Sequence, residues 1–344
     1  MNELYIKSTD RAYCKQRYEP ISTSLKPIAE LVDASKHITS IVSYNNGIYV
    51  GTYENGIMYK WNGADSWVQV TNQHPTEYGI VIFVYNGKIM AGTTPNGLLL
   101  EWDGNNGWIE RASSIGEILI ATFVEYNGEL YAGTQVGGKL LKWNGSDSWI
   151  QVAGTYNNQF YINTLCVYNN KIYAGTAPDG YLFEWNGIDS WVQLADFIPF
   201  FVGAVYHKQT GIKKLIVYNN KLYAGTTPNG VLVAWNDNGY WETTTFPSSP
   251  LYYCDSPIND IIIYNNCFYC CTEKGDKDKK HGLYRIDTNS NTQLTPPVDV
   301  ALRCLLIWNG YLLIGTNSCK LYLYNGIKWH NIYPGIQHYD GNWK

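Results

Sequence analysis

Short runs in which apolar and polar residues alternate follow one another along this chain, and they recur in a fixed order. From residue 161 the chain reads YINTLCVYNN, then KIYAGT, a four-residue turn, YLFEWNG and, from residue 191, WVQLA. Each run is rich in aromatic and β-branched residues and is bounded by Asn, Gly or Pro, which is the pattern of β-strands joined by tight turns. The pattern therefore predicts a unit of four strands, called A to D below.

The unit occurs seven times. Tyr-Asn followed by Asn or Gly marks the turn between strands A and B, and Trp308 replaces the tyrosine in the seventh copy. The six anchor tyrosines are Tyr44, Tyr85, Tyr126, Tyr168, Tyr218 and Tyr264. Successive anchors lie 41 to 50 residues apart, and one four-stranded sheet can bury both its faces only by stacking on neighbouring sheets. The sequence predicts an all-β fold, a seven-bladed β-propeller of four-stranded antiparallel blades.

Residues that recur at the strand ends have structural roles. Asn-Gly or Asn-Asn between strands A and B tolerates the positive φ of a tight turn. Between B and C, Thr94–Gly97 and its copies combine a proline that presets φ with a glycine that accepts a left-handed conformation. A Gly-Thr pair ends strand B in most copies. Its glycine lets neighbouring sheets approach closely, and its threonine can satisfy a backbone group at the blade edge.

The repeats resemble those of the β-propeller superfamily and, more specifically, the Tyr-Asn-Gly-Lys-Leu-Tyr-Ala-Gly-Thr type of bacterial and bacteriophage surface proteins. The resemblance covers residues 38 to 333. The Gly-His and Trp-Asp pairs of WD repeats and the Gly-Gly pair of kelch repeats are absent. This resemblance implies a protein that attaches to a surface or takes part in an assembly, such as a virion-associated tail or head fibre or decoration protein.

Composition narrows the classes of partner. Charged residues make up 16% of the chain and the formal net charge is -4, which gives no large positive field for nucleic acid. No segment approaches 18 continuous apolar residues, and the chain does not open with a basic region before an apolar one. We expect synthesis in the cytoplasm without a signal peptide and without membrane insertion. The eight cysteines do not recur with the repeat and are expected to be reduced.

Two tryptophan ladders offer either stacking surfaces for sugar rings or packing between blades. They occupy the end of strand C and the start of strand D, at Trp61, Trp102, Trp143, Trp185 and Trp235, and at Trp67, Trp108, Trp149, Trp191, Trp241 and Trp329. A large aromatic residue that fills the same place in nearly every copy favours packing. The turn aspartates Asp65, Asp147 and Asp189 favour capping of their own turns over calcium binding.

The remaining reactive residues also favour structural roles. Glu101 and Glu184 on strand C give way to Lys or Ala in other copies, so they form no catalytic pair. Cys267, Cys270 and Cys271 superficially resemble part of a zinc set, but the last two occupy positions where other copies have small buried residues. We therefore expect a protein that is not an enzyme and that needs no metal and no cofactor.

Binding is expected where the repeat departs from itself. Residues 196–211 and 245–254 lengthen two D-to-A connections, and residues 273–281 replace the B-to-C turn of the sixth copy. Because these connections emerge on the same side of an up-and-down blade, the insertions should form one patch. The binding residues predicted there are Phe197, Phe200, Phe201, Tyr206, Phe246, Tyr252, Tyr253, Lys277 and Lys279. The alternative is that the aromatic residues plug the disc or cover an imperfect joint.

The chain is expected to divide into three parts. Residues 1–36 form either an arm that docks onto an assembly, which we favour, or a clasp on the last blade; residues 37–335 form the propeller and residues 336–344 a tail. The predicted function is a non-enzymatic binding propeller, an attachment protein of a bacteriophage virion that recognises a surface glycan or protein. The alternatives are a purely structural virion component, a soluble glycan-binding lectin, and a propeller-fold glycan hydrolase or lyase.

Overall fold

The computed structural model describes residues 27–30, 37–113, 115–196, 199–202, 205–243, 253–254, 256–273, 282–286, 291–294, 301–327 and 329–330. All regular elements in these residues are β-strands. Consequently no helix of the described part of the chain is long and apolar enough to span a membrane.

The strands form successive four-stranded antiparallel units, each called a blade here. Blades 1 to 3 contain β2 (His37–Tyr44), β3 (Gly47–Tyr53), β4 (Met58–Trp61), β5 (Trp67–Gln69), β6 (Gly79–Tyr85), β7 (Lys88–Thr94), β8 (Leu99–Trp102), β9 (Trp108–Ala112), β10 (Leu119–Tyr126), β11 (Glu129–Gln135), β12 (Leu140–Trp143) and β13 (Trp149–Ala153). Blades 4 and 5 contain β14 (Tyr161–Tyr168), β15 (Lys171–Ala177), β16 (Leu182–Trp185), β17 (Trp191–Ala195), β20 (Gly211–Tyr218), β21 (Lys221–Thr227), β22 (Gly230–Trp235) and β23 (Trp241–Thr243). Blades 6 and 7 contain β25 (Ile258–Tyr264), β26 (Cys267–Thr272), β27 (Leu283–Ile286), β28 (Asn291–Leu294), β29 (Leu302–Trp308), β30 (Tyr311–Thr316), β31 (Lys320–Tyr324) and β32 (Trp329–His330).

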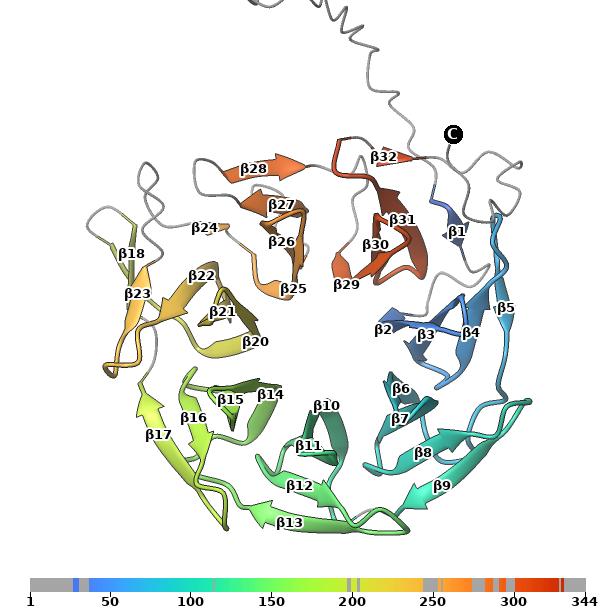
Figure 1. The fold of residues 1–344 in the computed structure, drawn as a ribbon, viewed down its shortest axis with the longest axis horizontal. Helices are drawn as coiled ribbons and strands as arrows, with labels where there is room; N and C mark the ends of the chain where they lie inside the picture. Colours follow the sequence, from blue (N-terminus) through green and yellow to red (C-terminus); the bar gives the residue numbers. More distant parts are fainter. Residues whose placement is uncertain are drawn as a thin grey trace, which may run out of the picture.

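The blades stand around a central axis, with strand A of each blade innermost (Figure 1). Four further short strands lie outside this pattern: β1 (Ala29–Glu30), β18 (Pro199–Val202), β19 (Val205–Lys208) and β24 (Tyr253–Cys254). The strand β18 pairs only with β19, whereas β24 pairs with β22 and β1 with β31. The predicted all-β propeller of four-stranded antiparallel blades is confirmed.

Neighbouring blades share their hydrophobic cores, and the Gly-Thr pair makes this close packing possible. A Cβ atom on Gly133 of β11 would lie 2.5 Å from Cγ2 of Ile162 on β14, in the next blade. The following threonine is fully buried, and Thr134 Oγ1 accepts a hydrogen bond of 3.0 Å from the N–H of Lys139. The same bond closes the B-to-C connection at Thr93, Thr176 and Thr226. Both roles predicted for the pair are confirmed.

The anchor tyrosines bind each blade to the next. The hydroxyl of Tyr44 donates to the carbonyl oxygen of Gly87, in the A-to-B turn of blade 2, over 3.1 Å. The same bond recurs from Tyr85 to Gly128, Tyr126 to Asn170, Tyr168 to Asn220, Tyr218 to Asn266 and Tyr264 to Gly310, over 2.6 to 3.4 Å. These six bonds are called the tyrosine staples below. They explain why the Tyr-Asn pair is repeated.

The joint between blades 7 and 1 is closed differently. Trp308, in place of a tyrosine, packs edge to face on Trp61 with 5.5 Å between ring centroids. The outer edge of β31 is shared by two short strands, β1 at Lys320 and Leu321 and β32 at Leu323 and Tyr324. Residues 29–30 of the predicted arm or clasp are thus paired with the last blade, while residues 1–26 and 336–344 lie outside the described residues.

The C-to-D turns correct one detail of the sequence interpretation. In the first of them the capping side chain is Asn62, whose Oδ1 accepts the N–H groups of Ala64, Asp65 and Ser66 over 2.8 to 3.2 Å. Asp65 instead accepts from Asn62 Nδ2 over 3.4 Å. The tryptophans on either side of the turn are register partners, Trp61 with Trp67, and both are buried, as expected for packing. In the B-to-C turns, the peptide bonds before Pro95, Pro178 and Pro228 are cis, which the sequence pattern did not predict.

Candidate binding site at the mouth of the central channel

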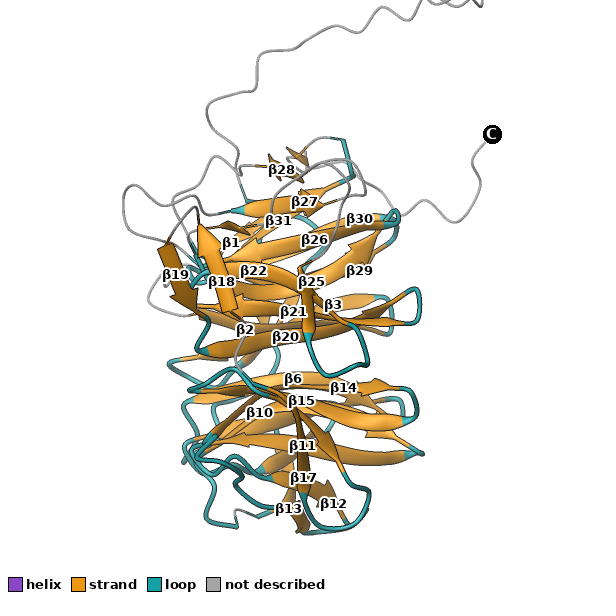
Figure 2. Ribbon diagram, turned by 90° about the vertical axis from the view of Figure 1, so that its left-hand side faces the viewer, coloured by secondary structure: helices purple, strands orange, loops and turns teal. Residues whose placement is uncertain are grey.

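The two faces of the disc carry different connections. The N–H of Tyr78, just before strand A of blade 2, donates to the carbonyl oxygen of Thr94 at the end of strand B over 2.8 Å. The N–H of Thr210 bonds in the same way to Thr227 of blade 5. The D-to-A and B-to-C connections therefore share one face, called the D–A face. The β18–β19 hairpin lies on this side, opposite the A-to-B turns (Figure 2).

Strand A carries an irregularity where it enters the blade on the D–A face. In every blade except blade 2, the pairing of strands A and B skips one residue near the start of strand A. Such a β-bulge redirects one side chain out of the regular alternation. The skipped residues are Thr39, Ala121, Asn163, Lys213, Asn259 and Arg303. Together with Val81 of blade 2 they line a cavity of about 370 Å³ at the axis, the channel mouth.

The wall of the channel mouth is chemically uneven. Blades 1 to 3 contribute Thr39, Val81 and Ala121, the neighbouring Tyr53 and Leu119, and the polar His37 and Gln135. Blades 4 to 7 contribute Asn163, Lys213, Asn259 and Arg303. The first half of the mouth therefore carries most of the apolar surface, and the other half suits groups that accept hydrogen bonds or carry negative charge.

Amides on the polar half are held by the next blade. Asn163 Nδ2 donates to the carbonyl oxygen of Ile212 over 3.1 Å, and Asn259 Nδ2 donates to that of Leu302 over 2.7 Å. Gln135, from blade 3, donates its Nε2 to Asn163 Oδ1 over 3.3 Å. These bonds fix the side chains at the rim, so the mouth is a preformed surface.

Three cations stand on the strands β20 and β29 of the polar half, and ion pairs involve two of them. Arg303 and Glu273 form a two-pronged ion pair with both N···O distances at 3.1 Å, and Lys214 Nζ lies 2.7 Å from Asp260 Oδ1. No ion pair or hydrogen bond joins Lys213 to another described residue. Burial lowers the pKa of Lys213; Glu273 opposes this shift and Arg303 adds to it. The pKa of Lys214 is instead raised, chiefly by the charge of Asp260.

An exposed apolar rim adjoins the other half of the mouth. It consists of Ile118, Val136, Phe160 and Tyr161, all at least 39% exposed. Tyr161 is the register partner of Gln135, and a Cβ atom on Gly138 would collide with the backbone oxygen of Gln159, so these segments of blades 3 and 4 are in contact. Val136 also has a φ of 81°, a left-handed conformation that costs a β-branched residue energy.

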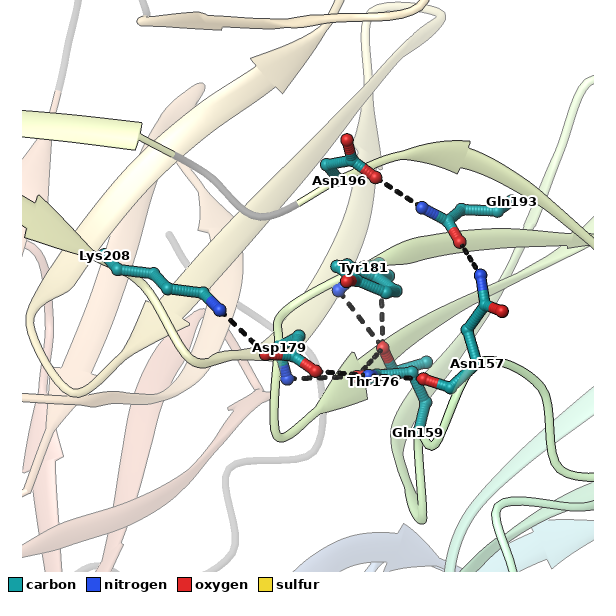
Figure 3. A network of polar contacts seen from close by, with 8 residues as sticks. All are labelled: Asn157, Gln159, Thr176, Asp179, Tyr181, Gln193, Asp196 and Lys208. Atoms are coloured by element: carbon teal, nitrogen blue, oxygen red, sulfur yellow. Dashed lines mark hydrogen bonds and ion pairs between the residues drawn. The ribbon is translucent and has the colours of Figure 1, made fainter.

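A polar network centred on the buried Gln159 connects the β18–β19 hairpin to blade 4 (Figure 3). Gln159 is fully buried, and its Oε1 accepts from the hydroxyl of Thr176 and from the N–H of Asp179, each over 3.0 Å. Its Nε2 donates to Asp179 Oδ2 over 2.9 Å. Lys208, at the end of β19, pairs with Asp179 Oδ1 over 2.7 Å and holds the pKa of that carboxyl below its usual value.

The nine binding residues predicted from the sequence are only partly placed. Phe200, Phe201 and Tyr206 belong to the β18–β19 hairpin, where Phe201 and Tyr206 are register partners, and Tyr253 in β24 pairs with Val231. Five lie outside the described residues: Phe197, Phe246, Tyr252, Lys277 and Lys279. Their assignment as binding residues remains a prediction.

Sequence reasoning missed the channel mouth, although the signal was present. In the copies with a bulge, the lining residue stands five positions before the anchor and directly follows a repeated Ile or Leu, such as Ile162 before Asn163. Insertions drew attention, whereas a variable position inside a regular strand did not. The repeated Ile or Leu marks where this position lies in each copy.

Other reactive groups lie within blades. Glu101 is paired with Lys88 over 2.7 Å and with Arg111 over 2.8 Å. Glu184 accepts from Lys171 and from the hydroxyl of Tyr173 over 2.6 and 2.8 Å. Disulfides are absent at Cys166, Cys267, Cys270, Cys271, Cys304 and Cys319, and Cys270 and Cys271 are fully buried. Within the described residues no group of three or more His, Cys, Asp or Glu side chains is arranged to hold a metal.

Comparison with solved structures identifies the fold. A catalytically inactive virginiamycin B lyase from Staphylococcus aureus with quinupristin has a TM-score of 0.64 at 10% identity, over 85% of this chain and 96% of that one. YCF48 bound to D1 peptide has a TM-score of 0.60 at 13% identity, over 86% and 95% of the two chains. The WD40 β-propeller domain of Doa1 has a TM-score of 0.62 at 14% identity, over 88% and 97%.

No protein-family model and no curated protein matches the sequence. The structural neighbours include a lyase as well as a protein in complex with a peptide. At these identities the likeness concerns the fold, and the chain is a β-propeller.

Proposed function

We propose that this protein is a non-enzymatic binding propeller that holds a segment of a partner protein on its D–A face. One observation carries the proposal: the skipped residue of strand A differs from blade to blade and lines the channel mouth, while the residue before it is always Ile or Leu. Repetition maintains a scaffold, so a variable and clustered position on that scaffold is where a site is expected. The cavity of about 370 Å³ falls within the range of pockets that take small groups.

Further features support binding of a protein segment. The rim of Ile118, Val136, Phe160 and Tyr161 is an exposed apolar surface next to polar groups, a combination common in interfaces. YCF48, one of the structural neighbours, has been solved with a peptide bound. The carboxylates first considered for catalysis, Glu101 and Glu184, are engaged in ion pairs within their own blades.

A matched pair of substitutions tests the proposal. Ile118 on the D–A face is 46% exposed, and Ile188, in a C-to-D turn on the opposite face, is 76% exposed. A random hexapeptide display library is selected on the immobilised protein, and selected peptides are titrated against Ile118→Glu and Ile188→Glu. We expect peptides whose affinity falls at least tenfold with Ile118→Glu and stays unchanged with Ile188→Glu. Failure to select any peptide, or equal loss in both variants, contradicts the proposal.

The proposed biological setting is attachment of a bacteriophage particle, with assembly in the host cytoplasm. This setting is supported by the type of repeat, Tyr-Asn-Gly-Glu-Leu-Tyr-Ala-Gly-Thr at residues 126–134 being one copy close to it. Co-purification of the protein with virus particles would support the setting, and its absence from purified particles would contradict it. Loss of particle assembly on deleting residues 1–26 would instead favour a purely structural virion role.

Two alternative functions, glycan binding and catalysis, are tested by separate measurements. A glycan array probed with the same protein tests the lectin alternative, and binding of sugars that Ile118→Glu removes would favour it over a protein partner. Turnover of a polysaccharide, abolished by one carboxylate substitution, would contradict the non-enzymatic proposal. We expect the library to yield peptides, the glycan array to show no binding that depends on Ile118, and no polysaccharide to be turned over.

A further inference from the structure

We propose that the channel mouth binds one carboxylate of a peptide segment, with Lys213 as the cation that receives it and the apolar rim as the seat of the residues beside it. This inference rests on the proposed function and adds the chemistry of the ligand. It follows from the charges, the hydrogen-bond donors, the volume of the mouth and the surface around it.

The first step is the balance of charge. Arg303 is matched by Glu273, and Lys214 by Asp260. Asp260 is further fixed because its Oδ2 accepts the N–H of Leu305 over 2.9 Å. Lys213 is left as the cation without an ion-pair partner among the described residues. One unmatched positive charge in a partly buried mouth suits one carboxylate better than a phosphate, which carries nearly two negative charges.

The second step concerns hydrogen-bond donors. Nε of Arg303 is buried and has no hydrogen-bond partner among the described residues. A buried donor without an acceptor is costly, more so when the group is charged. Lys213 and Arg303 come from strands β20 and β29 but line the same cavity. A carboxylate entering the mouth can therefore accept from Lys213 directly and relieve the electrostatic cost of the guanidinium beside it.

The third step concerns the kind of molecule that brings the carboxylate. The mouth is too small for a folded element but has room for one acidic side chain or a peptide C-terminus. On the other side of the mouth, Tyr53 and Leu119 continue the wall toward the exposed Ile118. An acidic residue flanked by apolar or aromatic residues matches this arrangement. A strongly anionic polymer does not, because the protein itself carries a formal net charge of -4.

The test uses the hexapeptide library selected on the intact protein. Selected peptides are expected to be enriched in Asp or Glu next to an apolar residue. Lys213→Met, which removes the charge and keeps the length of the side chain, should weaken them roughly ten- to hundredfold. Lys213→Arg should retain most of the affinity. The control is Lys60→Met on strand C of blade 1, an exposed lysine over the ring of Tyr49, which should have no effect.

Charge reversal sharpens the test. Selection on Lys213→Glu should shift the preference from acidic to basic peptides. Thermal unfolding of each variant is measured beside binding, and the variants at this partly exposed position should melt close to the parent protein. If Lys213→Glu unfolds early, the comparison of Lys213→Arg with Lys213→Met still decides, because both keep a long side chain and only arginine keeps the positive charge.

The failures are distinguishable. Peptides that depend on Ile118 but show no acidic enrichment and no response to Lys213→Met overturn the carboxylate inference and leave the proposed function intact. The absence of any peptide overturns both. Binding of acidic sugars in place of peptides, lost in Lys213→Met, confirms the chemistry of the mouth but overturns the assignment to a peptide.

Discussion

The two ends of strand A differ in how the seven blades use them. At the end facing the A-to-B turns, six tyrosines repeat and each bonds to the next blade. At the other end the skipped residue is Thr, Ala, Asn, Lys, Asn or Arg, and it faces the channel. The same strand therefore holds the ring together at one end and carries a variable, channel-facing residue near the other. Sequence repetition in this protein separates structural from candidate binding positions within a span of a few residues.

Adding volume at a repeated position should cause the largest loss of stability. Gly133→Val places atoms against Ile162, where a Cβ alone would stand at 2.5 Å. Overpacking of this kind is expected to cost about 2–3 kcal/mol in the free energy of unfolding. The matched change at the variable end is Ala121→Val, which extends into the cavity and should cost less than about 0.5 kcal/mol. Urea unfolding of both variants measures the difference, and equal losses would break the comparison.

A somewhat smaller loss is expected at the pair formed by the buried Gln159 and the partly exposed Asp179 on the D–A face. Gln159→Glu brings a second carboxylate against Asp179, where an amide now donates over 2.9 Å. The repulsion and the lost bond should cost about 2 kcal/mol at neutral pH. The folded-state pKa of the new glutamate would be raised, so the loss should shrink as the pH falls from neutral toward about 4, the pKa of an unperturbed glutamate.

The same pair offers its own repair. In blade 2 the partners are exchanged, and Glu77 accepts from Asn96 Nδ2 over 2.6 Å. Combining Gln159→Glu with Asp179→Asn reproduces that arrangement and should restore most of the stability in the same urea titration. No recovery in the double variant would mean that the contact in Figure 3 is not the source of the loss.

A staple is expected to contribute less than either of these. Tyr264→Phe removes the 2.6 Å bond to Gly310 while keeping the ring, and should cost about 1 kcal/mol. Tyr240→Phe, at an exposed tyrosine in a C-to-D turn, is the control and should change the unfolding midpoint little. If both changes shift the unfolding midpoint equally, the hydrogen bonds of the tyrosine staples add no stability beyond the packing of the rings.

The smallest effect should have the opposite sign. Val136→Gly relieves the left-handed φ of 81° at a β-branched residue and should stabilise the protein by about 0.5 kcal/mol, since the entropy of glycine offsets part of the gain. Peptides selected on the D–A face should nevertheless bind several-fold more weakly. Glu54→Gly, at the equivalent position of blade 1 with a φ of 80°, should raise the free energy of unfolding by the same amount without weakening peptide binding. Unchanged peptide affinity would remove Val136 from the site.

The sequence predicted the fold well because its information is periodic. Seven copies of one pattern indicate strands, turns and stacking together, and the buried Gly-Thr pair behaves as expected. The sequence predicted less about the contacts between blades. Nothing in the Tyr-Asn turn itself shows that the tyrosine hydroxyl bonds to the next blade, because that contact depends on the distance between sheets.

The candidate site was harder to predict for a related reason. A β-bulge is a matter of register, and register is set by pairing over a whole strand. Lys213 stands next to Lys214 in the sequence, yet one faces the channel without an ion pair and the other is paired with Asp260. Only the structure separates these two lysines. Three of the seven predicted aromatic residues lie outside the described residues, and the role of all seven in binding remains a prediction.

The outer edge of the last blade has a consequence for how the protein is made. Ala29 pairs with Leu321, and the same strand also receives Trp329 opposite Tyr324. During synthesis Ala29 leaves the ribosome long before Leu321, its partner in β31. Blade 1 therefore has no blade 7 beside it until synthesis is nearly complete. Ring closure is then a late, long-range event, of the kind that slows folding and leaves strands open to wrong pairing in the meantime.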